Sequence, residues 1–93
     1  MLNSFGDKGT RKIWEGEKVL GISTALQEKA RMKLRMLNNS QDINDLKIPP
    51  SNRLEKLKGK LKNHFSIRIN NQWRIVFKWN NGNASEVTII DYH

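Results

Sequence analysis

Cysteine is absent from this 93-residue chain, and histidine occurs twice. Disulfides therefore cannot stabilise the fold, and the sequence predicts neither a zinc centre nor any other cofactor site. No stretch approaches the ~20 apolar residues of a membrane span. The first six residues also lack the basic-then-apolar pattern of a signal peptide. We therefore expect a cytoplasmic protein with no metal, no cofactor and no contact with a membrane.

Acidic residues are scarce as well. Seventeen Lys and Arg stand against nine Asp and Glu, which gives a net charge of +8 and an isoelectric point near 10.1. A protein of this charge attracts polyanions, and nucleic acid is the first candidate. Ribosomal surfaces and acidic protein partners are also compatible, and so is a merely basic protein without a polyanionic ligand.

The length suits one domain over residues 1–93. Apolar residues recur every three or four positions in residues 24–38, which predicts an amphipathic helix whose wet side carries Lys29 and Lys33. Apolar and polar residues alternate in the second half, which is typical of strands with one buried face. The expected elements are a short strand over 1–6, helices over 8–18 and 24–38, and strands over 64–70, 73–79 and 86–92. We therefore predict an α+β fold in which the two helices cover the apolar face of an antiparallel sheet.

Two further expectations concern the connections. Residues 41–52 link the two halves, with one helical turn around 42–46, and the prolines predict an extended backbone over 48–52. The strand over 86–92 is almost wholly apolar from Val87 to Ile90, which predicts a central place in the sheet.

The alternation places two arginines on one face. Ile67 and Ile69 must face the helices, so Arg68 faces away, and the same argument turns Arg74 away. Each guanidinium offers a planar fork of donors that suits a phosphate. Ordinary solvent-facing charges are the alternative explanation.

A basic segment leads into this sheet. Its cations are Arg53, Lys56, Lys58, Lys60 and Lys62. Glu55 is the one acid among them, and His64 follows. Clustered cations neutralise phosphates without regard to base sequence, so we expect the segment to border the open face and bind RNA. A solvated loop is the alternative.

The chain ends in Asp91, Tyr92 and His93. RNA can be cut without metal if a base takes the 2′-hydroxyl proton, an acid protonates the departing 5′-oxygen and positive charge stabilises the transition state. An imidazole with an ordinary pKa near ~6.5 suits either proton transfer. A frayed terminus is the alternative.

Three segments, taken in order, resemble HigB-type toxins of the RelE/ParE superfamily. They are residues 49–59 (PPSNRLEKLKG), residues 66–77 (SIRINNQWRIVF) and the terminal Asp91-Tyr92-His93. The opening, with Phe5, Lys8 and Thr10, is also similar, so the resemblance covers essentially the whole chain. It implies two N-terminal helices packed on a twisted antiparallel sheet.

The resemblance also implies an activity and partners. HigB-type toxins cleave translated messenger RNA in the A site of the 30S ribosomal subunit and inhibit growth. Their usual partner is a HigA-type antitoxin with a helix-turn-helix domain, and the toxin reaches operator DNA only through this antitoxin.

Carried over by motif, the resemblance places Asp91, Tyr92 and His93 in the active site. Lys58 and Arg74 would contact the phosphate and its transition state, with Arg68 as an addition. The chain departs from some members in one respect, because Glu55 stands where they have a catalytic histidine. Either a neighbouring cation such as Arg53 or Lys56 compensates, or Glu55 itself serves as the base.

Two rival functions are also compatible with the sequence. ParE-like members of the superfamily act on DNA gyrase and are not nucleases. A basic module that binds RNA without cutting it is the second rival. Lys58, Arg74 and the terminal triplet favour the nuclease, because gyrase binding does not need such a set.

Overall fold

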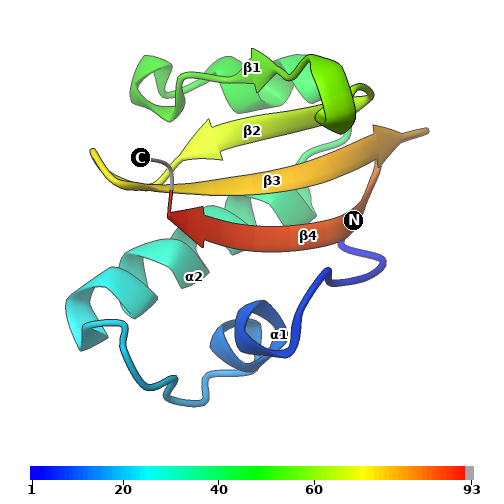
Figure 1. The fold of residues 1–93 in the computed structure, drawn as a ribbon. Helices are drawn as coiled ribbons and strands as arrows, with labels where there is room; N and C mark the ends of the chain where they lie inside the picture. Colours follow the sequence, from blue (N-terminus) through cyan, green and yellow to red (C-terminus); the bar gives the residue numbers. More distant parts are fainter. Residues whose placement is uncertain (92–93) are drawn as a thin grey trace.

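The computed structural model describes residues 1–91. Its helices are α1 (Lys8–Trp14) and α2 (Thr24–Asn39), and its short 3-10 helices are η1 (Ile43–Lys47), η2 (Pro50–Asn52) and η3 (Gly59–Leu61). Its strands are β1 (Glu55–Lys56), β2 (His64–Arg68), β3 (Trp73–Asn80) and β4 (Asn83–Asp91), in the antiparallel order β1-β2-β3-β4. Helices α1 and α2 lie on one side of the sheet (Figure 1). This arrangement confirms the predicted α+β fold.

Both helices begin with a side-chain cap. The Asp7 carboxylate accepts a hydrogen bond from the N–H of Thr10, and the Ser23 hydroxyl accepts one from the N–H of Leu26. Such caps satisfy backbone donors that have no partner inside the helix. Helix α1 ends at Trp14, earlier than the predicted residue 18, and Gly16 then adopts a left-handed φ of 86°. Glycine accepts this conformation without steric strain, so it ends the helix.

The hydrophobic core lies between α2 and the sheet. Ala30, Leu34 and Leu37 of α2 are buried, and they share one core with the inward-facing residues of the strands. The strand residues in this core are Ile67, Ile75, Phe77, Ala84, Val87 and Ile89. The face of the sheet opposite α1 and α2, which carries Ser66, Arg68 and Arg74, is called the open face below.

Strand β4 carries a bulge that keeps its apolar residues inward. Val76 pairs with Thr88 and Lys78 pairs with Ser85, so β4 has one residue more than β3 between these pairs. Glu86 lies in the bulge with a positive φ of 51°. The extra residue shifts the alternation by one position. Ala84 before the bulge and Val87 after it are therefore both fully buried.

The predicted central place of the last strand is wrong, because β4 lies at one end of the strand order. Its outer edge meets the N-terminal segment, which pairs through two isolated parallel bridges, Leu2–Ala84 and Phe5–Val87. Residues 1–6 thus form bridges and not the predicted strand. Backbone hydrogen bonds such as Asn3 N–H to the Ala84 carbonyl (2.8 Å) occupy this edge, which explains how a largely apolar strand can lie there.

The linker between the two halves corrects a second expectation. The predicted turn around 42–46 corresponds to η1, but Pro50–Asn52 forms a 3-10 helix and not extended chain. Proline is tolerated at the first position of a helical turn, where its missing N–H is not required. The sequence reasoning also missed β1, a two-residue strand that pairs with Ser66 and Phe65.

Asn52 connects this linker to α2, and its replacement provides a test of the packing. Its side chain is fully buried, donates to the carbonyl oxygens of Leu46 (3.1 Å) and Ile48 (3.4 Å), and accepts from Lys33 Nζ (2.5 Å). Asn52→Ala leaves these groups unpaired, and we expect it to lower the free energy of unfolding by about 2–4 kcal/mol. Urea denaturation measures the loss. The exposed Asn44→Ala is the control and should change stability by less than about 0.5 kcal/mol; equal stability of the two variants would contradict this account.

Candidate functional site

Arg68 and Arg74 lie directly opposite each other on adjacent strands, because the register of β2 and β3 makes them partners. Both side chains line one cavity of about 290 Å³. The residues around this cavity, called the arginine cavity below, are Arg53, Glu55, Arg68, Asn70, Asn71 and Arg74. The shared face expected from the alternation is therefore present, and phosphate binding by these residues stays a prediction.

Within residues 1–91, three chain segments contact the side chain of Arg74 and hold it in place. Its side chain lies against β2, where Nε donates to the Ser66 hydroxyl (2.9 Å), and Nη2 donates to the carbonyl oxygen of Arg53 (2.7 Å). Glu55 of β1 lies at the limit of an ion pair, with Oε1 4.0 Å from Nη2. Arg74 is only 8% exposed, so its guanidinium is fixed before any ligand arrives. Fixed donors do not have to reorganise when an anion binds.

The backbone around Arg53 explains how its carbonyl reaches Arg74. Arg53 ends η2 in a left-handed conformation with φ 45°. This conformation turns the chain from η2 into β1. Sequence reasoning assigned Arg53 and Arg74 to the site but missed Ser66, although the alternation places Ser66 on the open face. Its role depends on the pairing of β2 with β3, which no local pattern specifies.

Arg68 is held by the turn that follows it. Nε donates to the backbone carbonyl of Asn70 (3.0 Å), and Nη2 donates to the side-chain oxygen of Asn71. Asn70 in turn accepts from the backbone N–H groups of Gln72 and Trp73, both at 2.8 Å. The turn between β2 and β3 therefore acts as a scaffold for Arg68. Sequence reasoning identified Asn70 and Asn71 only as turn residues and missed their place in the cavity.

Asp91 ends β4 close to this turn, where the two chain segments lie at the same end of the sheet (Figure 1). Its carboxylate accepts a hydrogen bond from Gln72 Nε2 (3.0 Å). Asp91 is the register partner of Trp73, which packs against the core. Directly paired residues share a face of the sheet. Asp91 therefore lies at the hairpin end but not among the residues that line the arginine cavity. The predicted site residues Tyr92 and His93 lie outside the described residues.

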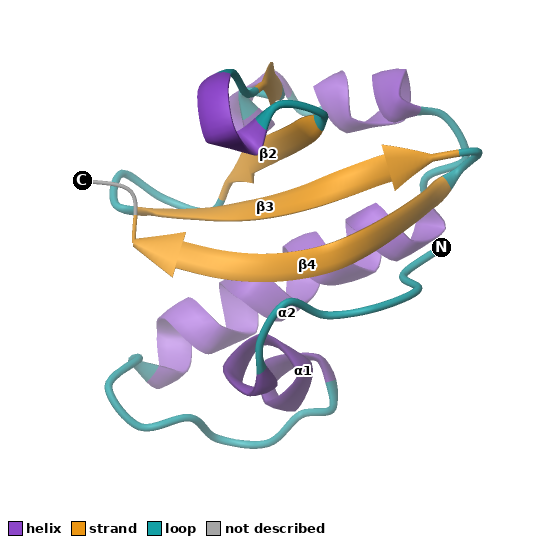
Figure 2. Cartoon of the chain, turned by 45° about the vertical axis from the view of Figure 1, so that its right-hand side comes forward, coloured by secondary structure: helices purple, strands orange, loops and turns teal. Residues whose placement is uncertain are grey.

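The lysines of the basic segment are exposed: Lys56, Lys58, Lys60 and Lys62. Lys58 precedes η3 and Lys62 follows it, and this short helix lies on the open side of β2 (Figure 2). Within residues 1–91, none of the four lines the arginine cavity, although Arg53 and Glu55 from the same segment do. Their assigned contacts with RNA stay predictions.

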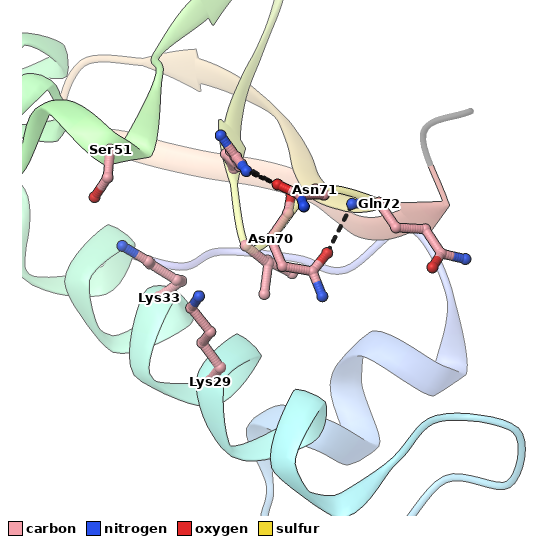
Figure 3. Close-up of a pocket in the computed structure, with 8 residues that line it drawn as sticks. Lys29, Lys33, Ser51, Asn70, Asn71 and Gln72 are labelled. Carbon is pink, nitrogen blue, oxygen red and sulfur yellow. Dashed lines mark hydrogen bonds between the residues drawn. The ribbon is translucent and has the colours of Figure 1, made fainter.

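A second cavity, of about 510 Å³, lies between α2 and the β2–β3 turn (Figure 3). The residues that line it are Lys29, Lys33, Ser51, Arg68, Ile69, Asn70, Asn71 and Gln72. Lys33 was expected on the wet side of α2, but it is only 7% exposed and donates to Asn52. Burial lowers the pKa of Lys33 below its ordinary value, and the positive charge of Lys29 lowers it further. The linker packs over α2 and covers Lys33. The helical periodicity of the sequence could not predict this contact, because the linker lies outside the helix.

Residues 1–91 contain neither a metal-binding cluster nor a membrane-spanning helix. No group of three or more His, Cys, Asp or Glu side chains in that range is placed to hold a metal ion. No helix among these residues combines the length and apolar character needed to cross a membrane.

Comparison with known sequences decides the family. The model of a family described as the RelE-like toxin of the type II toxin–antitoxin system HigB matches residues 3–93. This chain belongs to that family. The resemblance found in the sequence is thereby confirmed, and two relatives agree with it. Toxin HigB-1 of Vibrio cholerae is 38% identical over 94 residues, which cover 100% of this toxin and 98% of the relative. Endoribonuclease HigB of Proteus vulgaris is 28% identical over 93 residues and covers 100% of both chains.

Solved structures support the fold of this HigB-family toxin. The YoeB–YefM complex from Staphylococcus aureus includes a chain that superposes with a TM-score of 0.64 at 19% sequence identity. The match covers 100% of this toxin and 98% of that chain. Neither the family nor these relatives are named for an action on DNA gyrase, so the ParE-like alternative is not favoured.

The arginine cavity predicts how the affinity for RNA depends on salt concentration. If Arg68 contacts phosphate as predicted, Arg68→Gln removes one cationic contact, so the dependence of log affinity on log salt for single-stranded RNA should become shallower by about 0.7. Fluorescence anisotropy with a labelled RNA at several salt concentrations measures this slope. Arg35→Gln is the matched control, because Arg35 is exposed on α2 and lines neither cavity. An unchanged slope for Arg68→Gln would show that Arg68 does not contact phosphate.

Proposed function

We propose that this HigB-family toxin is an endoribonuclease that cleaves translated messenger RNA in the ribosomal A site and so inhibits growth. The observation that carries the proposal is the arginine cavity, where Arg68 and fixed Arg74 lie beside the carboxylate of Glu55. A phosphodiester needs cations for its charge and a base for the neighbouring 2′-hydroxyl. The relative from Proteus vulgaris named as an endoribonuclease supports the same activity.

The proposed chemistry uses groups of the chain and no metal ion. Glu55 accepts the proton of the 2′-hydroxyl, and the 2′-oxygen then attacks phosphorus. Arg68 and Arg74 stabilise the charge that develops on the phosphate oxygens. The bond to the 5′-oxygen breaks, and His93 protonates this oxygen. The products are a 2′,3′-cyclic phosphate and a 5′-hydroxyl, so protons and electrons balance.

The remaining assigned residues have supporting parts in this proposal. Lys58 contacts the phosphate or its transition state, and the exposed lysines on either side of it attract the RNA backbone. Tyr92 orients or stacks on the substrate. Asp91 acts through its neighbours, as a positioning residue at the end of β4. Ribosomal RNA helps to order the messenger in the A site, which would explain why so small a protein can rely on few catalytic groups.

We also propose a HigA-type antitoxin with a helix-turn-helix domain as the partner, with operator DNA bound only through it. Membership in a family of type II toxin–antitoxin toxins supports an antitoxin, and the superposed chain belongs to a complex named for YoeB and YefM. Because translated messenger RNA is the proposed substrate, the proposed site of action is the cytoplasm.

Arg74→Ala tests the nuclease directly. After brief induction in a bacterial host, primer extension on a reporter messenger should show discrete in-frame cuts for the wild-type chain. These cuts should need translation and fall at least about 100-fold in Arg74→Ala, because one fixed donor to a developing anion contributes on this scale. Circular dichroism of the purified variant checks that it folds. Growth arrest by the wild type with an intact messenger would instead identify a different target.

Glu55→Gln tests the assignment of the base. The amide keeps the size of the carboxylate but cannot accept the proton, so cleavage on purified ribosomes should fall roughly 100-fold or more. Glu55→His restores a group that can accept a proton, and it should recover much of the activity. RNA binding should change little in Glu55→Gln, because binding relies on the cations. Full activity of Glu55→Gln would exclude Glu55 as the base.

A further inference from the structure

The second cavity holds cations that the proposed chemistry does not use. Lys29 and Lys33 lie one turn apart on α2, and both line this cavity. The side chain of Lys29 extends toward the space below the β2–β3 turn, whereas that of Lys33 extends toward Ser51 and the linker (Figure 3). Arg68 closes the cavity from the sheet. Three positive side chains from two different elements therefore surround one space. We call it the lysine cavity.

The lining of the lysine cavity is suited to an anion. Besides the three cations its lining includes Ser51, Ile69, Asn70, Asn71 and Gln72, but no acidic residue. The amide of Gln72 points away from the lysines and donates to the Asp91 carboxylate (Figure 3). Within residues 1–91, no acidic side chain forms an ion pair with Lys29 or Lys33. The partner of Lys33 is the neutral amide oxygen of Asn52. The cavity therefore has no internal counter-charge among the described residues.

The direction of the pKa shift of Lys33 is consistent with an anion site in the lysine cavity. Burial and the nearby charge of Lys29 both lower its pKa, so the charged form of Lys33 is less favoured than in an exposed lysine. A bound anion would offset both effects, because an opposite charge nearby favours the protonated amine. A bound anion and the positive charge of Lys33 should therefore stabilise each other.

The lysine cavity adjoins the arginine cavity. Arg68, Asn70 and Asn71 line both of them. An extended polyanion with one phosphate at Arg74 therefore has a second cationic cavity directly across the turn. A single RNA strand carries phosphates at regular intervals and can occupy both, whereas an isolated anion would fill only one.

We propose that the lysine cavity binds a second phosphate of the same RNA strand, away from the bond that is cut. This inference rests on the proposed function, since the strand is positioned by its scissile phosphate in the arginine cavity. Lys29 makes the contact from the exposed side, and Lys33 and Arg68 complete it. The site binds backbone and carries no base preference, in keeping with contacts that position a nucleic acid without reading its sequence.

The test compares Lys29→Gln with wild type on a series of 2′-O-methyl RNA oligonucleotides of one base and increasing length. These probes cannot be cut through the 2′-oxygen, so binding is measured apart from cleavage. Affinity of the wild type should rise once the oligonucleotide reaches both cavities. Lys29→Gln should bind those longer probes roughly 5-fold more weakly than wild type, and it should bind the shortest probe as tightly as wild type does. For the longer probes, the slope of log affinity against log salt should become shallower by about 0.7. The matched control is Lys12→Gln, an exposed lysine of α1 that lines neither cavity.

The outcomes separate this inference from the nuclease. A Lys29→Gln protein that binds every length like Lys12→Gln would overturn the second phosphate site, even if wild-type cleavage is observed. An equal loss at all lengths would overturn it as well, because the contact would then not be remote. If Lys29→Gln binds RNA normally but binds the antitoxin weakly, the cavity is a protein contact and the proposal is wrong. Absence of cleavage by the wild type would defeat the proposed function, while the binding result would stand separately.

Discussion

A guanidinium group that is almost fully buried needs partners for its N–H donors, and in this toxin that requirement holds the open face together. Arg74 on β3 donates to the Ser66 hydroxyl on β2 and to the Arg53 carbonyl at the end of η2. The linker and the two central strands, β2 and β3, are therefore tied through one side chain. Leaving such a buried charge without partners costs several kcal/mol, so the fold and the site depend on the same hydrogen bonds.

The same rigidity serves the proposed chemistry. Arg68 is fixed by the turn that follows it, and Arg74 by the strand beside it. Donors that are already oriented stabilise a developing charge more effectively than flexible surface cations do. The exposed lysines of the basic segment have the complementary property, because long mobile side chains attract a polyanion without fixing its position. In the proposed function, the fixed arginines bind the scissile phosphate, and the exposed lysines attract the rest of the RNA strand.

Helix α2 connects the core to the polar surface. Ala30, Leu34 and Leu37 pack against the sheet, while Lys33, on the same helix, is buried by the linker through Asn52. A lysine can be buried in this way when its ammonium group keeps a hydrogen-bond acceptor. As a result the helix that completes the core also brings two cations next to the turn that carries Arg68 (Figure 3). Core packing and the placement of charge near the site are therefore not independent.

Local periodicity in the sequence was sufficient to place α2, the three long strands of the second half and the shared face of Arg68 and Arg74, because side-chain direction follows backbone period. It did not determine where α1 ends. The family could also be recognised from ordered motifs. The edge position of β4, the 3-10 helix at Pro50, the burial of Lys33 and the part played by Ser66 were decided by the tertiary structure. Each depends on which distant segment packs or pairs with the residue: the N-terminal segment on β4, the linker on α2, and β2 on β3. Such partners lie far apart in the chain, and a pattern that extends over a few residues carries no information about them.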